Sequence, residues 1–166
     1  MEDSCTIYYA SPVGMLQLTS TGSCISCVHF MNEPLPVLPP PPEHIPVVLQ
    51  QCVDELIAYF QGALTQFTVP LQQDGTEFQQ RVWAALLQIP FGKTISYQTL
   101  AKRLGDPKVI RAAASTNGKN NIAIIVPCHR VIGSQQDLVG YGGGLWRKRW
   151  LLQMEMKYAH GVQTLF

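Results

Sequence analysis

The sequence predicts an α/β protein: a small antiparallel sheet with one helix, followed by a mostly α-helical domain that contains a helix-turn-helix. Alternating and β-branched segments fill the first 30 residues, and helical repeats of apolar residues dominate after residue 75. The charge also changes sign. Residues 1–73 hold six acidic and no basic residues (−6), whereas residues 74–166 hold five acidic and all 12 basic residues (+7, with His neutral). We therefore predict two domains, 1–73 and 74–166, and expect a polyanion to bind the basic one.

Three short strands are expected in the acidic part, at residues 5–10, 14–19 and 23–30. Each is rich in β-branched and aromatic residues or alternates apolar with polar residues. The Ser-Pro-Val-Gly sequence at 11–14 is typical of a turn. An antiparallel arrangement is the simplest interpretation of three such strands.

A proline-rich stretch at 33–42 favours polyproline geometry, which predicts a stiff surface connection. A helix is expected next, at 47–62, because apolar residues recur every four positions and Gly62 is a suitable end. Residues 63–73 are then a connector to the basic part.

The basic part begins with a predicted helix at 76–89, which Thr76 or Asp74 could cap. Two further helices are expected at 96–104 and 107–117, separated by Gly105 and a short break. A short break between two helices is the geometry of a helix-turn-helix.

The apolar run at 124–126 leads into Pro127 and Cys128, and predicts a buried strand or a stiff extended arm that presents the cysteine. His129 and Arg130 follow directly, and an imidazole and a guanidinium beside a thiol favour the reactive thiolate. The alternative is a buried structural cysteine with incidental neighbours.

A glycine loop at 140–144 and a last helix complete the chain. Trp146, Trp150 and Met154 recur every four residues and are expected in the core. Glu155 lies near the end of this helix, and a lone acidic residue in that position is expected to be solvated.

Composition limits the cellular setting. The five cysteines are an odd number, and neither a secretory signal nor an apolar stretch of about 20 residues is present. We therefore expect an intracellular protein in a reducing compartment, without a membrane partner. It would be nuclear in a eukaryote and cytoplasmic in a bacterium.

The Pro-Cys-His-Arg-Val sequence at 127–131 resembles the active-site motif of the O6-alkylguanine-DNA alkyltransferases. The similarity continues, in order and at the family's spacing, from about residue 75 to 156. It is weaker across 1–73. Further matching residues are Phe91-Gly92-Lys93-Thr94-Ile95-Ser96-Tyr97, Arg111-Ala112, Asn117-Gly118, Asn120, Gly140-Tyr141, Gly143-Gly144-Leu145, Lys148, Trp150-Leu151-Leu152 and Glu155.

This resemblance implies a ribonuclease-H-like N-terminal domain and a DNA repair activity. The alkyl group of O6-alkylguanine, and also of O4-alkylthymine, would pass irreversibly to Cys128 in a single turnover without a cofactor. His129 would remove the thiol proton through a water, and Glu155 would orient the imidazole.

The same resemblance assigns the guanine-binding residues. Tyr97 would donate a proton to N3, and the backbone carbonyls of Cys128 and Val131 would read the exocyclic amine. Asn120 would serve as a hinge. The loop formed by Tyr141, Gly142 and Gly143 would close over the base.

The implied partner is double-stranded DNA that contains O6-alkylguanine, bound in the minor groove by a helix-turn-helix, with the base flipped out. Arg111 would fill the vacated stack. Ala112, Ala113, Ala114 and Ser115 would let the helix approach closely. A monomer is expected, and cooperative binding along DNA is left open.

Some members of the family hold a structural zinc ion. Cys5, Cys24, Cys27 and His29 could supply four ligands here. On an alternating strand, however, Cys24 and Cys27 would face opposite sides, so small buried cysteines are the favoured interpretation.

Two rival functions are considered. One is DNA binding without transfer, by a helix-turn-helix regulator or a damage-recognition relative, and the presence of Cys128 argues against it. The other is a methyl sensor that activates transcription, which would need a further DNA-binding domain that 166 residues do not accommodate.

Overall fold

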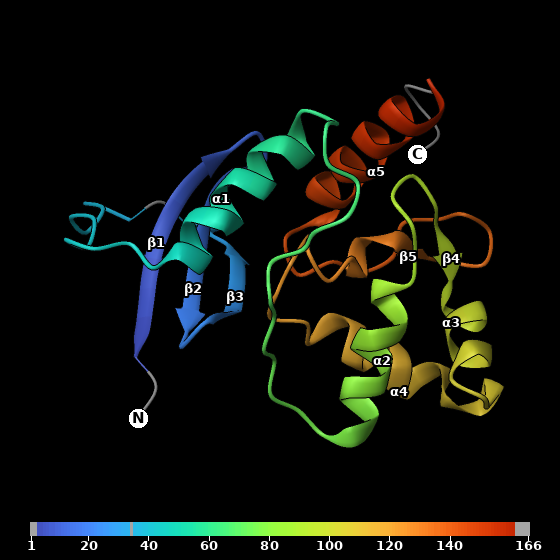
Figure 1. The fold of residues 1–166 in the computed structure, drawn as a ribbon. Helices are drawn as coiled ribbons and strands as arrows, with labels where there is room; N and C mark the ends of the chain where they lie inside the picture. The colour runs from blue at the N-terminus through green and yellow to red at the C-terminus, as the bar shows by residue number, and fades with distance from the viewer. Residues whose placement is uncertain (1–2, 34, 162–166) are drawn as a thin grey trace. The chain divides into compact units, whose positions relative to one another are not determined.

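The computed structural model describes residues 3–33 and 35–161 and divides into two compact units (Figure 1). The first comprises Met1–Gln73 with Asn121–Ala123, and the second comprises Asp74–Asn120 with Ile124–Phe166. The predicted division into independent domains at residue 73 stays a prediction. The structure adds that residues 121–123 belong with the sheet of the first unit.

The first unit is a three-stranded antiparallel sheet with one helix packed on it (Figure 1). The strands β1 (Ser4–Ser11), β2 (Gly14–Thr21) and β3 (Cys24–Phe30) lie in chain order, and α1 (Val47–Phe60) contacts all three. All three predicted strands and the predicted helix are confirmed. The fully buried side chains of this unit include Leu16, Leu18, Ile25, Leu49, Cys52, Leu56 and Tyr59.

The register of β2 and β3 shifts between Thr19 and Ser20. Thr21 pairs with Cys24 and Thr19 pairs with Cys27, so Ser26 is the additional residue of a β-bulge. Because a bulge reverses the alternation of a strand, Cys24 and Cys27 point to the same side, away from the buried Ile25 and Val28. The expectation that the two cysteines face opposite sides is wrong for this reason.

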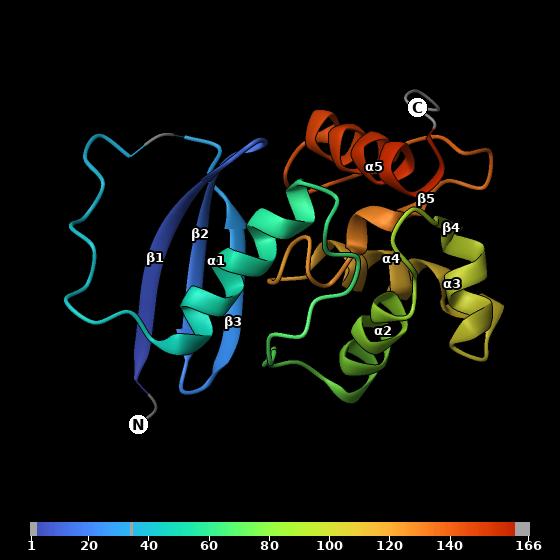
Figure 2. The ribbon, with the colours of Figure 1, turned by 45° about the horizontal axis from the view of Figure 1, so that its top comes forward.

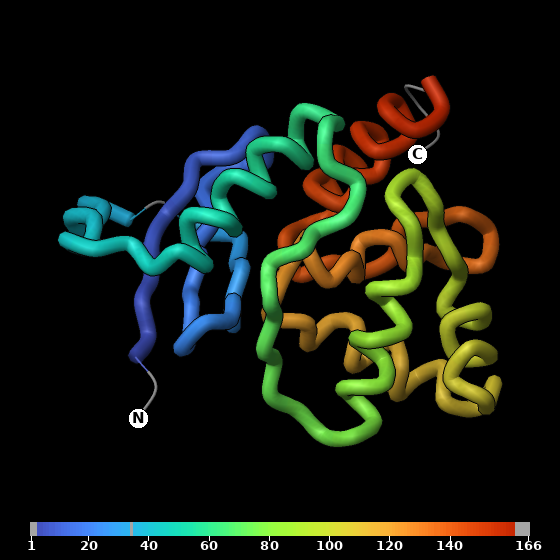
Figure 3. Tube along the Cα trace, viewed as in Figure 1, coloured from blue at the N-terminus to red at the C-terminus, as the bar shows by residue number. Residues whose placement is uncertain are grey.

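Two segments from distant parts of the chain line the outer edge of β3. Ile25 exchanges backbone hydrogen bonds with residues 70–72, and Val28 exchanges them with residues 121–123. The connection over residues 35–46 has no helix or strand and makes a long excursion before α1 (Figure 3).

The second unit contains four α-helices among its described residues: α2 (Glu77–Leu87), α3 (Tyr97–Arg103), α4 (Ile110–Gly118) and α5 (Leu145–His160). A short parallel ladder of β4 (Ile95–Ser96) and β5 (Val131–Ile132) lies between α5 and the other three helices (Figures 1 and 2).

The predicted helix pair of this unit is confirmed, with one difference. Ser96 caps α3, but the second helix begins as a 3-10 turn, η1 (Pro107–Val109), before α4. Asp106 Oδ1 accepts from the Lys108 amide and so stabilises that first turn. At the start of α2, Thr76 forms a capping box with Gln79, which settles the choice between Thr76 and Asp74.

The segment that carries Cys128 is buried as predicted, but the expected strand is wrong. Ile124 has φ +71°, and a second 3-10 turn, η2 (Cys128–Arg130), follows Pro127. Two local hydrogen bonds fold the chain here, from the Cys128 amide to the Val126 carbonyl and from the Arg130 amide to the Pro127 carbonyl. The strand β5 begins directly after the turn.

The helix α5 does not bury its tryptophans as predicted. Trp146 is 53% exposed and Trp150 is half-buried, whereas Met154 is buried. The buried face instead contains charged residues, because their partners lie inside the unit. Its members are Arg147, Lys148, Leu151, Leu152 and Glu155. Among the described residues, no helix is long and apolar enough to cross a membrane.

Candidate active site

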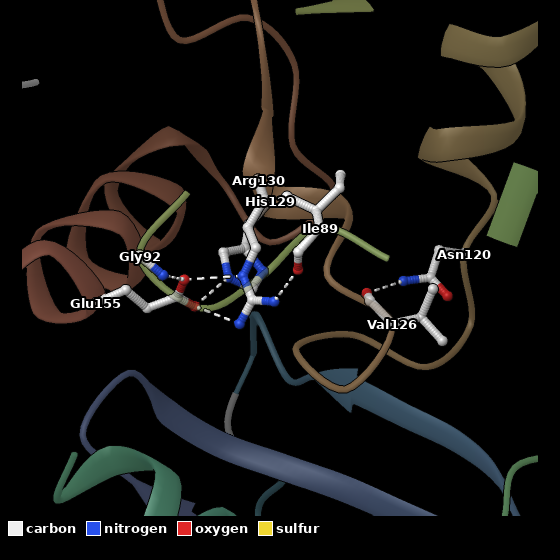
Figure 4. Close-up of polar contacts among 7 residues, drawn as sticks. All are labelled: Ile89, Gly92, Asn120, Val126, His129, Arg130 and Glu155. Atoms are coloured by element: carbon white, nitrogen blue, oxygen red, sulfur yellow. Dashed lines mark hydrogen bonds and ion pairs between the residues drawn. The ribbon is translucent and has the colours of Figure 1, made fainter. Parts of the chain in front are cut away.

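Cys128 opens the turn η2, and its side chain is buried. The Asn120 amide nitrogen donates to Cys128 Sγ at 3.3 Å and to the Val126 carbonyl at 2.9 Å (Figure 4 shows the second bond). Asn120 therefore holds the sulfur and the backbone that leads to it in one arrangement.

The resting form of Cys128 is the thiol. Burial raises the pKa of Cys128, against the hydrogen bond from Asn120 and the charge of Lys148, which lower it. The side chains of His129 and Arg130 both turn to Glu155. The expectation that these two neighbours make Cys128 a thiolate is therefore wrong, and a base must take its proton.

The carboxylate of Glu155 gathers four donor groups (Figure 4). His129 Nε2 lies 2.6 Å from Oε2, and Arg130 binds both oxygens through Nε (2.8 Å) and Nη2 (3.1 Å). The Gly92 amide donates to Oε1 at 3.2 Å. Arg130 Nη1 also donates to the Ile89 carbonyl at 2.7 Å. Residues distant in the sequence therefore meet at one carboxylate.

Glu155 is ionised at neutral pH. Burial alone would raise the pKa of Glu155, but the charges and hydrogen bonds of His129 and Arg130 outweigh burial and lower it to about 2. Burial lowers the pKa of His129 in spite of the opposing effect of Glu155, so the imidazole is neutral at pH 7 and Arg130 is then the charged partner of Glu155.

The tautomer of His129 follows from this geometry. A neutral ring that lies 2.6 Å from an ionised carboxylate through Nε2 carries its hydrogen on Nε2. The Nδ1 atom is then a buried lone pair, with no hydrogen-bond partner in the described part of the chain. This arrangement leaves His129 Nδ1 able to accept a proton.

Lys148 forms hydrogen bonds with two segments of the site, β5 and the start of the glycine loop. Its ammonium group is fully buried and donates to the carbonyls of Val131 (2.7 Å), Val139 (3.0 Å) and Gly140 (3.4 Å). Burial lowers the pKa of Lys148 to about 8, although the neighbouring Cys128 raises it. The lysine thus links strand β5, which follows the Cys128 turn, to the start of the glycine loop.

Two tyrosines and the glycine loop complete the site. The Tyr97 hydroxyl donates to the Val139 carbonyl at 3.4 Å. Tyr141 lies near Cys128, and burial raises the pKa of its enclosed hydroxyl well above the usual value. The Gly143 carbonyl accepts from Arg147 Nη1 at 3.0 Å, whereas Gly142 is exposed.

Residues 77–157 match the family described as "6-O-methylguanine DNA methyltransferase, DNA binding domain", and residues 5–73 match its "ribonuclease-like domain". The chain belongs to the 6-O-methylguanine DNA methyltransferase family. This confirms the predicted family and fold class, including the ribonuclease-like first part.

Relatives and solved structures in this family resemble the chain over nearly its whole length. The methylated-DNA–protein-cysteine methyltransferase of Mycobacterium tuberculosis is 47% identical over 159 residues, which cover 94% of each chain. The crystal structure of the O6-methylguanine methyltransferase of that organism superposes with a TM-score of 0.83, at 44% identity over 95% of each chain. The crystal structure of M. tuberculosis OGT in complex with DNA has a TM-score of 0.81, at 47% identity over 94% of each chain.

The structure brings the predicted Cys128, His129, Glu155, Asn120 and Tyr97 together in the second unit, with Val131 and the Tyr141 loop, and their roles stay predictions. Sequence reasoning gave no role to the side chains of Lys148 and Asn117, whose Nδ2 donates to the Cys128 carbonyl at 3.3 Å. It expected the Arg130 guanidinium to act on Cys128, whereas Arg130 binds Glu155. Each of the three lies within a matching motif, which is the one signal that could have identified them. Their charge or polarity otherwise indicates a surface position.

The predicted DNA-facing residues of α4 are not all on its surface. Arg111, Ala112 and Ser115 are exposed and Ala114 is half-buried. Ala113 is fully buried, so its predicted place against DNA is wrong. Because 3.6 residues make one helical turn, four consecutive residues cannot share one face.

The structure does not assemble the four zinc candidates. Cys5 pairs with Ser20, whose side chain is buried, whereas Cys24 and Cys27 lie on the opposite face and His29 is exposed. In the part of the chain that the structure describes, no group of three or more His, Cys, Asp or Glu residues could hold a metal ion.

The methyltransferase should lose stability as the pH falls. His129 and Glu155 both have folded-state pKa values below their ordinary values of 6.5 and 4.5, so the unfolded chain binds more protons in acid. The free energy of unfolding, measured with urea, should decrease below pH 6.5 and again between pH 4.5 and about 2. His129→Gln should remove the first decrease, and His44→Gln, in the other unit, is the matched control. An unchanged slope in His129→Gln would contradict the assignment.

Asn120→Ala should make Cys128 less reactive at neutral pH. The substitution removes the hydrogen bond that lowers the pKa of the thiol and leaves the burial that raises it. Alkylation of Cys128 by iodoacetamide, followed by peptide mass, should therefore require a higher pH. Asn121→Ala, at the exposed neighbouring position, should behave like the unmodified chain.

Proposed function

We propose that this protein repairs DNA by moving the alkyl group from O6 of guanine to Cys128 Sγ, once per chain. The observation that carries the proposal is the buried pair of Glu155 and neutral His129, with His129 next in the chain to the buried thiol of Cys128. A structural cysteine would need neither an oriented base nor an ionised carboxylate behind that base.

The chemistry balances without a cofactor. His129 Nδ1 takes the thiol proton through a water, and Sγ then attacks the alkyl carbon. A sulfur–carbon bond forms and the carbon–O6 bond breaks, with its electron pair leaving on guanine. Tyr97 donates a proton to guanine N3 and regains one from the medium that receives the thiol proton. The products are a thioether and neutral guanine, and nothing in the site reverses this reaction.

Each partner of His129 contributes to the proton transfer. When the imidazole becomes an imidazolium, the carboxylate of Glu155 lies 2.6 Å away and stabilises the new charge. Arg130 keeps that carboxylate ionised before the reaction begins. Arg130 therefore offsets the energetic cost of burying the Glu155 carboxylate before the proton transfer, and the His129 imidazolium adds to this after it.

The backbone around Cys128 would recognise the flipped base. The carbonyls of Cys128 and Val131 accept from the exocyclic amine, and Lys148 fixes the Val131 carbonyl. The loop of Tyr141, Gly142 and Gly143 closes over the base. O4-alkylthymine lacks this exocyclic amine, and it is proposed as a second substrate because its alkyl carbon is open to the same attack by Cys128.

Duplex DNA would bind through α4 and the positive charge of the second unit. Arg111 is exposed, as a residue that enters the base stack must be, and Ala112 and Ser115 present short side chains beside it. The solved relative in complex with DNA supports the same partner. A cytoplasmic location is proposed, because the relatives described above are bacterial. A monomer is proposed as well. No structural zinc is proposed.

Incubation with duplex DNA that contains O6-methylguanine should add one methyl group per chain, detected by intact mass and mapped to Cys128. Cys128→Ala should bind the duplex without any gain in mass. Tight binding of the lesion by the unmodified chain without a mass change would instead favour the damage-recognition alternative.

Arg111→Ala should slow repair of duplex DNA about tenfold or more and leave transfer from free O6-benzylguanine nearly unchanged. Arg111 would compensate for unstacking a base, which costs a few kcal/mol, and a free base needs no unstacking. Single-turnover rates on the two substrates test this, with Arg149→Ala on α5 as a matched exposed control. Equal losses on both substrates would remove the flipping role.

A further inference from the structure

Arg130 is a buried cation whose guanidinium is anchored on two sides (Figure 4). On one side it binds Glu155, with Nε 2.8 Å from Oε1 and Nη2 3.1 Å from Oε2. On the other side Nη1 donates to the Ile89 carbonyl at 2.7 Å, and the ring of Phe91 lies 5.9 Å from the guanidinium carbon. The guanidinium therefore cannot turn away from the carboxylate without losing its bond to Ile89.

Arg130 and His129 share this one carboxylate. His129 Nε2 lies 2.6 Å from Oε2, the same oxygen that accepts from Arg130 Nη2. The three buried side chains together hold a single negative charge, and Arg130 already matches it when the imidazole is neutral. A protonated His129 would add a positive charge with no anion left in this group, and burial makes an unmatched charge costly.

The other titratable groups around the imidazole do not change this balance at neutral pH. Lys148 of α5 is a further cation and points its ammonium group at backbone carbonyls. Burial raises the pKa of Cys128 and the pKa of Tyr141, so both are uncharged at pH 7. His160, at the end of α5, lies 3.0 Å from the Gly92 carbonyl. Burial lowers the pKa of the imidazole, and the charges of Arg130 and Lys148 act in the same direction, against Glu155.

We propose that Arg130 is a positioning residue that keeps His129 neutral until Cys128 supplies a proton. The consequence for catalysis rests on the function proposed above. In the transfer step the S–H bond of Cys128 breaks, and a proton passes through a water to His129 Nδ1, where an N–H bond forms. The thiolate left behind is the second anion that the imidazolium needs. The net charge of the site is therefore conserved in this step, whereas a proton from the solvent would leave it unbalanced.

Arg130→Met should reverse the effect of pH on stability. In the unmodified chain the folded-state pKa of His129 is below 6.5, so the free energy of unfolding increases as the pH rises through this region. Without Arg130 the charge of Glu155 is unmatched, and the balance of burial then favours a proton on His129. The pKa of His129 should rise above 6.5, by roughly one pH unit or more. The stability that this proton contributes is present below pH 6.5 and lost as the pH rises through the raised pKa.

Urea unfolding, from about one pH unit below 6.5 up to about 8, measures this reversal and stays below the titration of Lys148. The free energy of unfolding should increase with pH in the unmodified chain and decrease in Arg130→Met. Arg149→Met, at an exposed position of α5, is the matched control and should behave like the unmodified chain. In the double variant Arg130→Met/His129→Gln the decrease should disappear, because the group that titrates is absent.

The pH profile of methyl or benzyl transfer separates this role from a structural one. With free O6-benzylguanine, the single-turnover rate of Arg130→Met at pH 7 should be about tenfold or more below its rate at higher pH, since one pH unit changes the neutral fraction about tenfold. A residue that only supported the fold would lower the rate by the same factor at every pH. Arg130→Lys keeps the positive charge and should restore most of the profile of the unmodified chain.

The unmodified chain gives a second measurement if Arg130→Met does not fold. The ¹⁵N spectrum of the chain with labelled histidines should show His129 as a neutral ring at pH 7, with its hydrogen on Nε2. An imidazolium signal from His129 at that pH would overturn the inference. So would an unchanged sign of the stability slope in Arg130→Met, a reversal that persists without His129, or a uniform loss of rate.

Failure of the proposed function has a different signature. A chain that transfers no methyl group to Cys128 would refute the repair activity. The stability slopes and the histidine spectrum need no substrate, so they would still determine whether Arg130 controls the protonation of His129.

Discussion

The buried carboxylate of Glu155 is the group on which the active site depends. A negative charge in an apolar interior is costly unless it is paired and hydrogen-bonded, and here four donor groups surround the two oxygens. Those donors come from the turn at Gly92 and from His129 and Arg130 of the nucleophile segment. Glu155 therefore determines the tautomer of His129 and the orientation of the segment that carries Cys128. It also ties that segment to the turn at Gly92, which follows α2.

The charges around Cys128 suit the proposed single transfer. A permanently ionised Cys128 would be exposed to adventitious electrophiles, whereas burial holds it as a thiol. His129 is neutral, with a lone pair that has no other partner in the described residues. The reactive thiolate would thus form only when the base accepts its proton. Lys148, rather than Arg130, is the cation that favours this ionisation.

The helix α5 organises this site through side chains that resemble surface residues in the sequence. Lys148 holds the Val131 carbonyl and the start of the glycine loop, Arg147 holds the Gly143 carbonyl, and Glu155 holds the base. Their spacing places them along one buried face. A pattern that counts only apolar residues therefore assigned Trp146 to the core, whereas its indole is largely exposed.

The sequence by itself determined the strands, the main helices, the charge division and, through its motifs, the family and the residues proposed for transfer. Local periodicity and motif spacing report those features because neighbouring residues determine them. Only the tertiary structure decided the β-bulge at Ser26, the turn at Ile124 and the burial of Ala113. It also decided the roles of Arg130, Lys148 and Asn117. Whether a polar side chain is buried depends on partners tens of residues away, and local spacing carries no information about them.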